Sequence, residues 1–270
     1  MRINLQKKII LISLLFYSIN NLTKQILMNI VIPSYNNEKW CKKNIESTLN
    51  QDYDNFHIYF IDDCSSDKTF EIVKETVEKS GLKNKCSLVK NGKNYGALHN
   101  FYHVIHNCDD QSIIVQLDGD DWLADKDVLN NLNKIYNSKD IWLTYGQFRL
   151  YPDNSIGWCK PLSNKIIKNN AIRKSPWVTS HLRTFKAKLF KAIKLEDLLY
   201  KGAFYTMAPD LAMMFPMIEM AGERIYCFEK VLYIYNNSNP LSEHRIKHQL
   251  QKNLATYIRK QKPYKRLSNL

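Results

Sequence analysis

The chain has 270 residues, of which 44% are hydrophobic and 24% are charged. This length and composition allow one large domain with its own core, and they exclude a collagen-like chain and a largely disordered one. The formal net charge of +13 indicates an anionic partner: a nucleic acid, a membrane surface or a phosphate-bearing small molecule. The six cysteines lack the short spacing of a zinc site. Their even number permits disulfides, but in a chain of this length with its own core we expect free, partly buried thiols in a reducing compartment.

Residues 1–27 form a hydrophobic and basic extension. Its apolar run at 9–19 is shorter than the about 20 residues that a transmembrane helix needs. The run is typical of a signal-peptide core or of a helix on a membrane surface. Alternatively, Met28 is the natural start, because a strand begins directly after it. We therefore expect a cytoplasmic or membrane-peripheral protein.

Three strand–loop–helix units follow the extension. Apolar runs predict strands at 30–32, 57–61 and 87–90. Apolar residues at helical spacing predict helices at 38–49, at about 70–80 with Gly81 as the end, and at 97–106. A fourth strand is expected from Ile113 onward. This alternation is typical of right-handed βαβ units, so we expect an α/β fold with a mainly parallel sheet.

Three carboxylates crowd the end of the fourth strand, at Asp118, Asp120 and Asp121. Like charges this close repel and raise one another's pKa, so the cluster indicates a neutralising cation. Carboxylate oxygens favour hard ions such as Mg²⁺ or Mn²⁺, which complete their shell with water and substrate phosphates. The alternative is a solvated Asp-Gly turn.

Polar clusters follow each of the four predicted strands, at 33–36, 62–63, 94–96 and 118–121. In a parallel sheet, ligands bind outside the carboxyl ends of the strands, where these clusters meet. Their convergence favours a metal–diphosphate site over a simple turn.

These segments resemble, in order and spacing, the family 2 nucleotide-sugar glycosyltransferases. The resemblance rests on the segments 31–36 (VIPSYN), 61–67 (IDDCSSD), 94–96 (NYG) and 117–121 (LDGDD). It implies a GT-A fold over residues 28–240, which is a Rossmann-like, mainly parallel sheet flanked by helices with a helical or mixed acceptor side. It also implies a UDP-sugar donor, Mn²⁺ or Mg²⁺ as cofactor, and inversion at the anomeric carbon.

The resemblance further implies residues for the nucleotide. Pro33 and Tyr35 would line its pocket, and Asp63 would accept a hydrogen bond from the ring N–H of the uracil base. Asn94 and Gly96 would lie beside the nucleoside, where glycine permits a close backbone approach. Helix capping by Asp63 and a plain loop at 94–96 are the alternatives.

The same resemblance implies a separate role for each carboxylate of the acidic cluster. Asp118 would approach the ribose or the metal, and Asp120 would ligate the metal. Asp121 would be a second ligand or a partner that orients the first.

An inverting transfer needs a carboxylate that takes the proton of the acceptor hydroxyl. We expect Asp210 in this role, because it opens the apolar run 211–220 much as the base of the family opens a helix; N-capping is the alternative. Pro209 precedes it where the family has glutamate. The pair Glu196-Asp197 competes, but it lies in an amphipathic run at 191–200 that predicts a helix with a solvated charged face.

Two pairs of basic residues are further candidates, His181 with Arg183 and His244 with Arg245. His244 resembles a late histidine that binds metal or diphosphate in this fold. Arg183 or Arg245 would neutralise phosphate charge, and structural roles are the alternatives. The basic tail at 241–270 predicts an amphipathic helix, which contacts an anionic membrane or is solvated.

Two rival functions deserve comparison with sugar transfer. A nucleic-acid-binding protein would explain the positive net charge. However, aspartates cluster at the expected site, and without a metal their carboxylates would repel phosphate. A nucleotidyltransferase of similar fold commonly has a Gly-rich loop after the first strand, and residues 33–36 contain no glycine. We therefore expect a hexosyltransferase with a hydroxyl acceptor on a glycan, lipid or protein, and no nucleic-acid partner.

Overall fold

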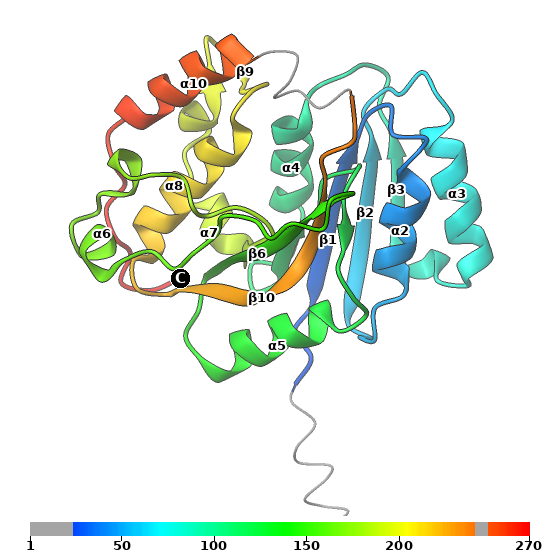
Figure 1. The fold of residues 1–270 in the computed structure, drawn as a ribbon, viewed down its shortest axis with the longest axis horizontal. Coiled ribbons are helices and arrows are strands. Elements are labelled where there is room, and N and C mark those ends of the chain that lie inside the picture. The colour runs from blue at the N-terminus through cyan, green and yellow to red at the C-terminus, as the bar shows by residue number, and fades with distance from the viewer. Residues whose placement is uncertain (1–23, 241–247) are drawn as a thin grey trace, which may run out of the picture.

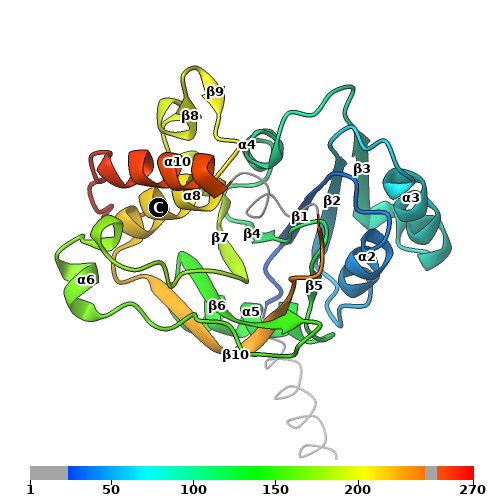
Figure 2. The ribbon, with the colours of Figure 1, turned by 45° about the horizontal axis from the view of Figure 1, so that its top comes forward.

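The computed structural model describes residues 24–240 and 248–270, and an eight-stranded sheet runs through it (Figure 1). The strand order is β3-β2-β1-β4-β7-β6-β10-β5, and Figure 2 shows β7 beside β4. The strands are β1 (Met28–Ser34), β2 (Phe56–Asp62), β3 (Cys86–Lys90), β4 (Ile113–Gln116), β5 (Trp122–Leu123), β6 (Leu143–Tyr151), β7 (Arg183–Lys186) and β10 (Ile225–Asn236). Four of the seven pairings are parallel, which confirms the expected α/β fold with a mainly parallel sheet.

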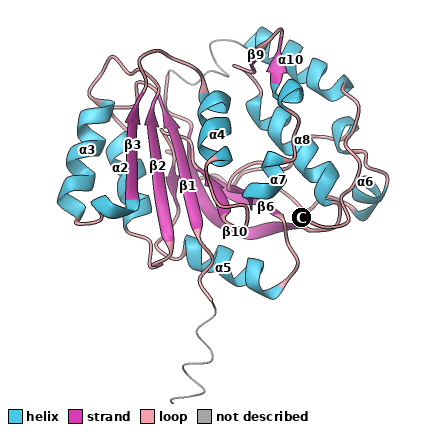
Figure 3. Ribbon diagram, turned by 180° about the vertical axis from the view of Figure 1, so that it is seen from behind, coloured by secondary structure: helices cyan, strands magenta, loops and turns pink. Residues whose placement is uncertain are grey.

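Helices flank this sheet, and a hairpin of β8 (Leu199–Tyr200) and β9 (Ala203–Phe204) stands apart from it. The helices are α2 (Cys41–Leu49), α3 (Thr69–Ser80), α4 (Ala97–His106), α5 (Val128–Ser138), α6 (Asn164–Lys168), α7 (Ala187–Lys191), α8 (Pro209–Ala221) and α10 (His248–Lys260), with short 3₁₀ turns η1 (Lys83–Lys85), η2 (Ile172–Lys174) and η3 (Leu195–Leu198). Figure 3 shows α2 and α3 on one face, and α4, α7 and α8 on the other. In the described part of the chain, no helix is both long and apolar enough to cross a membrane.

The central strands are mostly apolar because both of their faces are covered. In β1, Ile30 and Ile32 pack with residues of α2 and α3, whereas Val31 packs with residues of α4 and α8. Side chains of a strand alternate between its faces, so one apolar strand contributes to two cores. The predicted end of α3 is confirmed, since Gly81 caps it in the left-handed conformation with φ 73°.

The C-terminal helix packs against α8. Leu254 and Ile258 of α10 are only 4% and 2% exposed, while Leu250 and Tyr257 remain exposed. The predicted tail helix therefore forms, and two of its large apolar side chains pack inside the protein. These two side chains are thus not available to a membrane.

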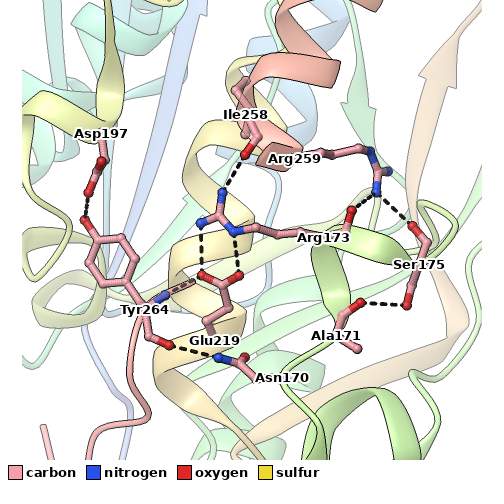
Figure 4. A network of polar contacts seen from close by, with 9 residues as sticks. All are labelled: Asn170, Ala171, Arg173, Ser175, Asp197, Glu219, Ile258, Arg259 and Tyr264. Atoms are coloured by element: carbon pink, nitrogen blue, oxygen red, sulfur yellow. Dashed lines mark hydrogen bonds and ion pairs between the residues drawn. The ribbon is translucent and has the colours of Figure 1, made fainter. Parts of the chain in front are cut away.

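A buried polar network fixes this packing (Figure 4). Arg173 of η2 donates through Nε and Nη2 to Glu219 of α8, at 2.6 and 2.9 Å, and through Nη1 to the carbonyl oxygen of Ile258 at 2.7 Å. The backbone N–H of Tyr264 donates to Glu219 at 2.9 Å. One ion pair thus ties η2, α8, α10 and the segment after α10 together.

The predicted helix at 191–200 is wrong. Within this range Lys191 ends α7, Leu195–Leu198 forms the 3₁₀ turn η3, and the backbone of Lys194 between them is extended. The N–H of Lys194 donates to the hydroxyl of Tyr264 at 2.9 Å instead of to a carbonyl one turn earlier. A tertiary contact has therefore overridden the local helical pattern.

The free state of the six cysteines is confirmed. The expectations for residues 1–23, and for His244 and Arg245, lie outside the described residues.

Candidate active site

The acidic loop after β4 is braced by β1 and α2. Gly119 packs so closely on the end of β1 that a Cβ at this position would lie 2.5 Å from Oγ and 2.8 Å from Cα of Ser34. Nδ2 of Asn44, in α2, donates to the carbonyl oxygens of Asp118 at 2.9 Å and of Asp121 at 2.7 Å. A side chain at position 119 would displace this loop. The glycine is therefore needed for the close packing of the loop on Ser34 as well as for the turn of the backbone.

Groups from β10 and the residues after it hold two of the loop's carboxylates. Asp121 accepts from the hydroxyl of Tyr233 at 2.5 Å and from the N–H of Asn236 at 2.6 Å, and it is 1% exposed. Asp120 accepts from Nδ2 of Asn239 at 2.7 Å. These three partners were not predicted from the sequence. Both oxygens of Asp121 are thus held by groups of β10.

His181 and Arg183 reach the loop from the opposite direction, because β7 runs antiparallel between β4 and β6. Nδ1 of His181 lies 3.8 Å from Oδ2 of Asp118, and its Nε2 lies 3.3 Å from Nη2 of Arg183. Arginine only donates, so the network assigns Nε2 as acceptor and places the proton of the neutral ring on Nδ1. Burial, followed by the charge of Arg183, lowers the pKa of His181 well below its usual value.

Asp210 completes a row of four side chains. It lies in the first turn of α8, where Pro209 occupies a favoured helix-start position, and its Oδ2 is 3.7 Å from Nη2 of Arg183. The row runs Asp118, His181, Arg183, Asp210, and it joins the acidic loop to the start of α8. We call it the catalytic row below.

Glu196 and Asp197, which compete with Asp210 for the role of the base, lie on η3 and not on α8. Glu196 is exposed on η3, and Asp197 accepts a hydrogen bond from the hydroxyl of Tyr264. No side-chain hydrogen bond or ion pair found among the described residues joins either of them to the catalytic row.

All three carboxyl groups of the loop have raised pKa values. Burial is the largest cause in each case. It raises the pKa of Asp120 to about 6, with a smaller contribution from the charge of Asp118. For Asp121 the charges of Asp120 and Asp118 add to burial, and the pKa rises well above its ordinary value. The loop is thus electrostatically suited to a positive ion.

The residues present fit a divalent cation. Asp118, Asp121 and His181 each offer a ligand atom, and these atoms lie within 4.8 Å of one another. Carboxylate oxygens are the ligands that Mg²⁺ and Mn²⁺ prefer, and imidazole is a common ligand of transition metals. His181 can join the carboxylates as a ligand through Nδ1 only in the tautomer that leaves Nδ1 unprotonated, which gives up the contact of Nε2 with Arg183. All of these ligand roles stay predictions.

Metal binding should depend on pH through these carboxyl groups. The folded pKa of Asp120 is about 6 against an ordinary 3.8, so its neutral form stabilises the fold below about pH 4, and this contribution is lost as pH rises through 6. A cation needs the ionised form. We expect Mn²⁺ to raise the thermal unfolding midpoint more at about pH 7.5 than at about pH 5; equal shifts, measured by calorimetry, would contradict this.

The predicted nucleotide residues lie at the same carboxyl edge of the sheet. Asp63 is 3% exposed and accepts from the N–H groups of Tyr95 at 3.0 Å and Gly96 at 2.7 Å. Its carboxylate therefore fixes the turn that carries Asn94 and Gly96, and Gly96 adopts φ 87°. Asp63 therefore does not cap α3, the helix that the alternative interpretation had in view, and instead holds the turn before α4.

The other residues of this half lie around the end of β1. Pro33 is buried within β1, and Tyr35 is 48% exposed just beyond it. The N–H of Asp63 donates to the carbonyl oxygen of Ser34 at 2.8 Å. The structure thus brings the nucleotide candidates together on the side of β1 that faces β2, and the acidic loop on the side that faces β4.

Solved structures of glycosyltransferases share this fold. TarS of Staphylococcus aureus in complex with UDP-GlcNAc has a TM-score of 0.61 at 17% identity, covering 79% of this chain and 59% of that chain. A mannosyltransferase from Pyrobaculum calidifontis in complex with GDP-Man and Mn²⁺ has a TM-score of 0.60 at 19% identity, covering 90% and 67%. Glucosyl-3-phosphoglycerate synthase from Mycobacterium tuberculosis, with Mn²⁺, UDP and glucosyl-3-phosphoglycerate, has a TM-score of 0.56 at 12% identity, covering 86% and 80%. The fold is therefore the expected GT-A fold.

Sequence relatives match a shorter part of the chain. A dolichyl N-acetyl-alpha-D-glucosaminyl phosphate 3-beta-D-2,3-diacetamido-2,3-dideoxy-beta-D-glucuronosyltransferase of Methanococcus voltae is 39% identical over 59 residues, which are 21% of this chain and 18% of that protein. The poly(ribitol-phosphate) beta-N-acetylglucosaminyltransferase TarS is 35% identical over 57 residues, which are 20% of this chain and 10% of that protein. These matches span less than a fifth of either relative.

A model of glycosyl transferase family 2 matches residues 29–199, which is more than half of the chain. This range includes the nucleotide candidates, the acidic loop, His181 and Arg183. The chain therefore belongs to glycosyl transferase family 2.

Proposed function

We propose that this protein is a metal-dependent, inverting glycosyltransferase that moves a sugar from a nucleoside diphosphate, by preference UDP, to a hydroxyl acceptor. The observation that carries the proposal is the catalytic row, which joins the acidic loop to a carboxylate at the start of α8 through contacts of 3.8, 3.3 and 3.7 Å. Inverting transfer needs both parts within reach of one donor sugar. The solved structures with bound UDP or UDP-GlcNAc support the choice of donor.

The donor half of the site comprises the nucleotide residues and the acidic loop. Asp118 and Asp121 would hold the cation with His181, and the cation when bound supplies positive charge to the departing diphosphate. Arg183 adds a second positive charge. It is 4% exposed, and its Nε has no hydrogen-bond partner in the described structure. A buried, planar guanidinium with an unused donor is suited to an anion that accepts hydrogen bonds through two of its oxygens, such as a phosphate.

The acceptor half of the site depends on Asp210. Its carboxylate takes the proton of the acceptor hydroxyl while the acceptor oxygen forms its bond to the anomeric carbon. The bond from that carbon to the diphosphate breaks, and its electron pair leaves with the diphosphate. Attack from the side opposite the leaving group inverts the configuration.

A thermal-shift screen of nucleotide sugars tests this proposal. We expect a UDP-sugar with Mn²⁺ to raise the unfolding midpoint, since a ligand at about 100 times its Kd stabilises by about 2.7 kcal/mol. The shift should be lost in Asp118→Asn, which removes a charged cation ligand. Asp54→Asn is the matched control, because Asp54 is an exposed carboxylate before β2, at the opposite edge of the sheet. No stabilisation of the wild type by any nucleotide sugar with metal would refute the proposal.

A further inference from the structure

A small pocket adjoins the proposed base, Asp210. It has a volume of about 260 Å³ and lies between the first turn of α8 and the helix α10. Asp210 and Trp177 line it from the body of the protein, and Gln251, Lys252 and Arg259 line it from α10. Pockets for drug-sized ligands occupy about 300–1,000 Å³, so this one suits a single sugar unit or a short polyol.

The pocket is connected to the reaction centre through Asp210. Oδ2 of Asp210 contacts Arg183 at 3.7 Å, and Arg183 belongs to the catalytic row. A molecule in the pocket would therefore meet the same carboxylate that the proposed transfer uses to accept a proton. This places the pocket on the acceptor side of the reaction.

The charge of the pocket is positive. Arg183 offsets the charge of Asp210, which leaves the cations Lys252 and Arg259 on the facing wall. Neither takes part in an ion pair found among the described residues. Nη1 of Arg259 donates to the carbonyl oxygens of Arg173 at 2.7 Å and Ser175 at 2.9 Å, which fixes the guanidinium but does not neutralise it.

Trp177 provides an apolar wall beside these charges. Its ring is partly buried and packs edge-to-face on Phe215 at a centroid distance of 5.6 Å. An indole can cover the apolar face of a sugar ring while its N–H stays available to a polar group. One wall of the pocket thus suits a carbon skeleton, and another suits an anion.

We infer that this pocket binds an acceptor sugar or polyol that carries an anionic group, with the anion between Lys252 and Arg259 and a hydroxyl directed at Asp210. The inference rests on the proposed function, and it names the acceptor class for that site. Phosphate and carboxylate share the required chemistry, since both accept charge-assisted hydrogen bonds from Lys and Arg. The bonds formed and broken are those of the proposed transfer, because the anionic group stays on the acceptor throughout and takes no part in the reaction.

Calorimetric titration of the full chain with glucose 6-phosphate, glucuronate and glucose tests the inference. We expect at least one charged sugar to bind about tenfold more tightly than glucose, because one charge-assisted hydrogen bond accounts for a difference of this size. The two charged probes distinguish phosphate from carboxylate. Lys252→Gln should remove most of the difference. Lys260→Gln is the matched control, since Lys260 is exposed on the same helix and does not line the pocket.

Three results would overturn the inference: equal binding of charged and neutral sugars, no binding of any probe, or equal losses in the two lysine variants. Titration of the same samples with UDP and Mn²⁺ separates this failure from failure of the proposed function. If the wild type binds UDP but no charged sugar, only the acceptor class is wrong. If it does not bind UDP either, the proposed function fails as well.

Discussion

Replacing Asp210 by asparagine should slow sugar transfer by about 10²- to 10⁴-fold, which is the usual contribution of a general base. Asparagine keeps the shape of the side chain, and its amide oxygen can still face Arg183, but the amide cannot take a proton from the acceptor hydroxyl. Binding of nucleotide with Mn²⁺ should persist, because Asp210 belongs to α8 and not to the acidic loop. UDP release at saturating donor measures the first effect, and calorimetric titration with UDP measures the second.

The matched control for this variant is Glu196→Gln. Glu196 is the neighbouring acidic candidate of the sequence analysis, and its side chain is exposed on η3. Transfer by this control should equal that of the wild type. Wild-type turnover by Asp210→Asn, or a loss in Glu196→Gln of the same size, would exclude Asp210 as the base.

Removing Glu219 should destabilise the protein by about 3–5 kcal/mol, which is the usual effect of leaving one partner of a buried ion pair alone. The side chains of Arg173 and Glu219 are 6% and 0% exposed, so water cannot solvate the guanidinium that Glu219→Ala leaves behind. The N–H of Tyr264 loses its acceptor as well. Urea denaturation followed by circular dichroism measures the change in the free energy of unfolding.

A double variant shows whether the effect comes from an unpaired charge. Arg173→Met with Glu219→Leu should recover much of the loss, because an apolar pair of similar volume leaves no charge unpaired. Glu75→Ala is a control for ion pairs in general, since its bridge to Lys79 is exposed on α3 and should affect stability little. A loss below about 1 kcal/mol in Glu219→Ala would show that the pair does not hold α10 in place.

The helices and strands of the first half of the fold could be predicted from the sequence, because each depends on a local pattern of apolar and polar residues. The predicted helix at 97–106 has the bounds of α4, and Gly81 ends α3 as expected. Each strand from β1 to β4 is a short apolar run followed by polar residues, and the rule for parallel sheets placed those polar residues at one edge. The acidic loop could thus be assigned to a site before any contact was known.

The partners of that loop could not be predicted in the same way. Tyr233, Asn236 and Asn239 contact Asp121 and Asp120 across more than 100 residues of sequence. Nothing in their local pattern distinguishes them from other residues of a strand end. They reach the loop because β10 pairs with β5, and such long-range pairing leaves no periodic signal.

The second half also shows how a tertiary contact changes local structure. Arg183 was a candidate from its residue type, but its place beside Asp210 results from the antiparallel pairing of β7 with β4. The helix expected at 191–200 does not form because Tyr264 binds the backbone of Lys194. Both features depend on segments far apart in the chain.

The hydrogen bonds between the acidic loop and β10 affect the order in which the chain can fold during synthesis. The carboxylates at 118–121 leave the ribosome long before Asn236 and Asn239, which hold two of them in the folded protein. N-terminal parts of a chain generally begin to fold first, but here the loop cannot take its final form until β10 has joined β5 and β6. The carboxylate arrangement that we propose to hold a cation would therefore be completed late, by a nearly complete chain.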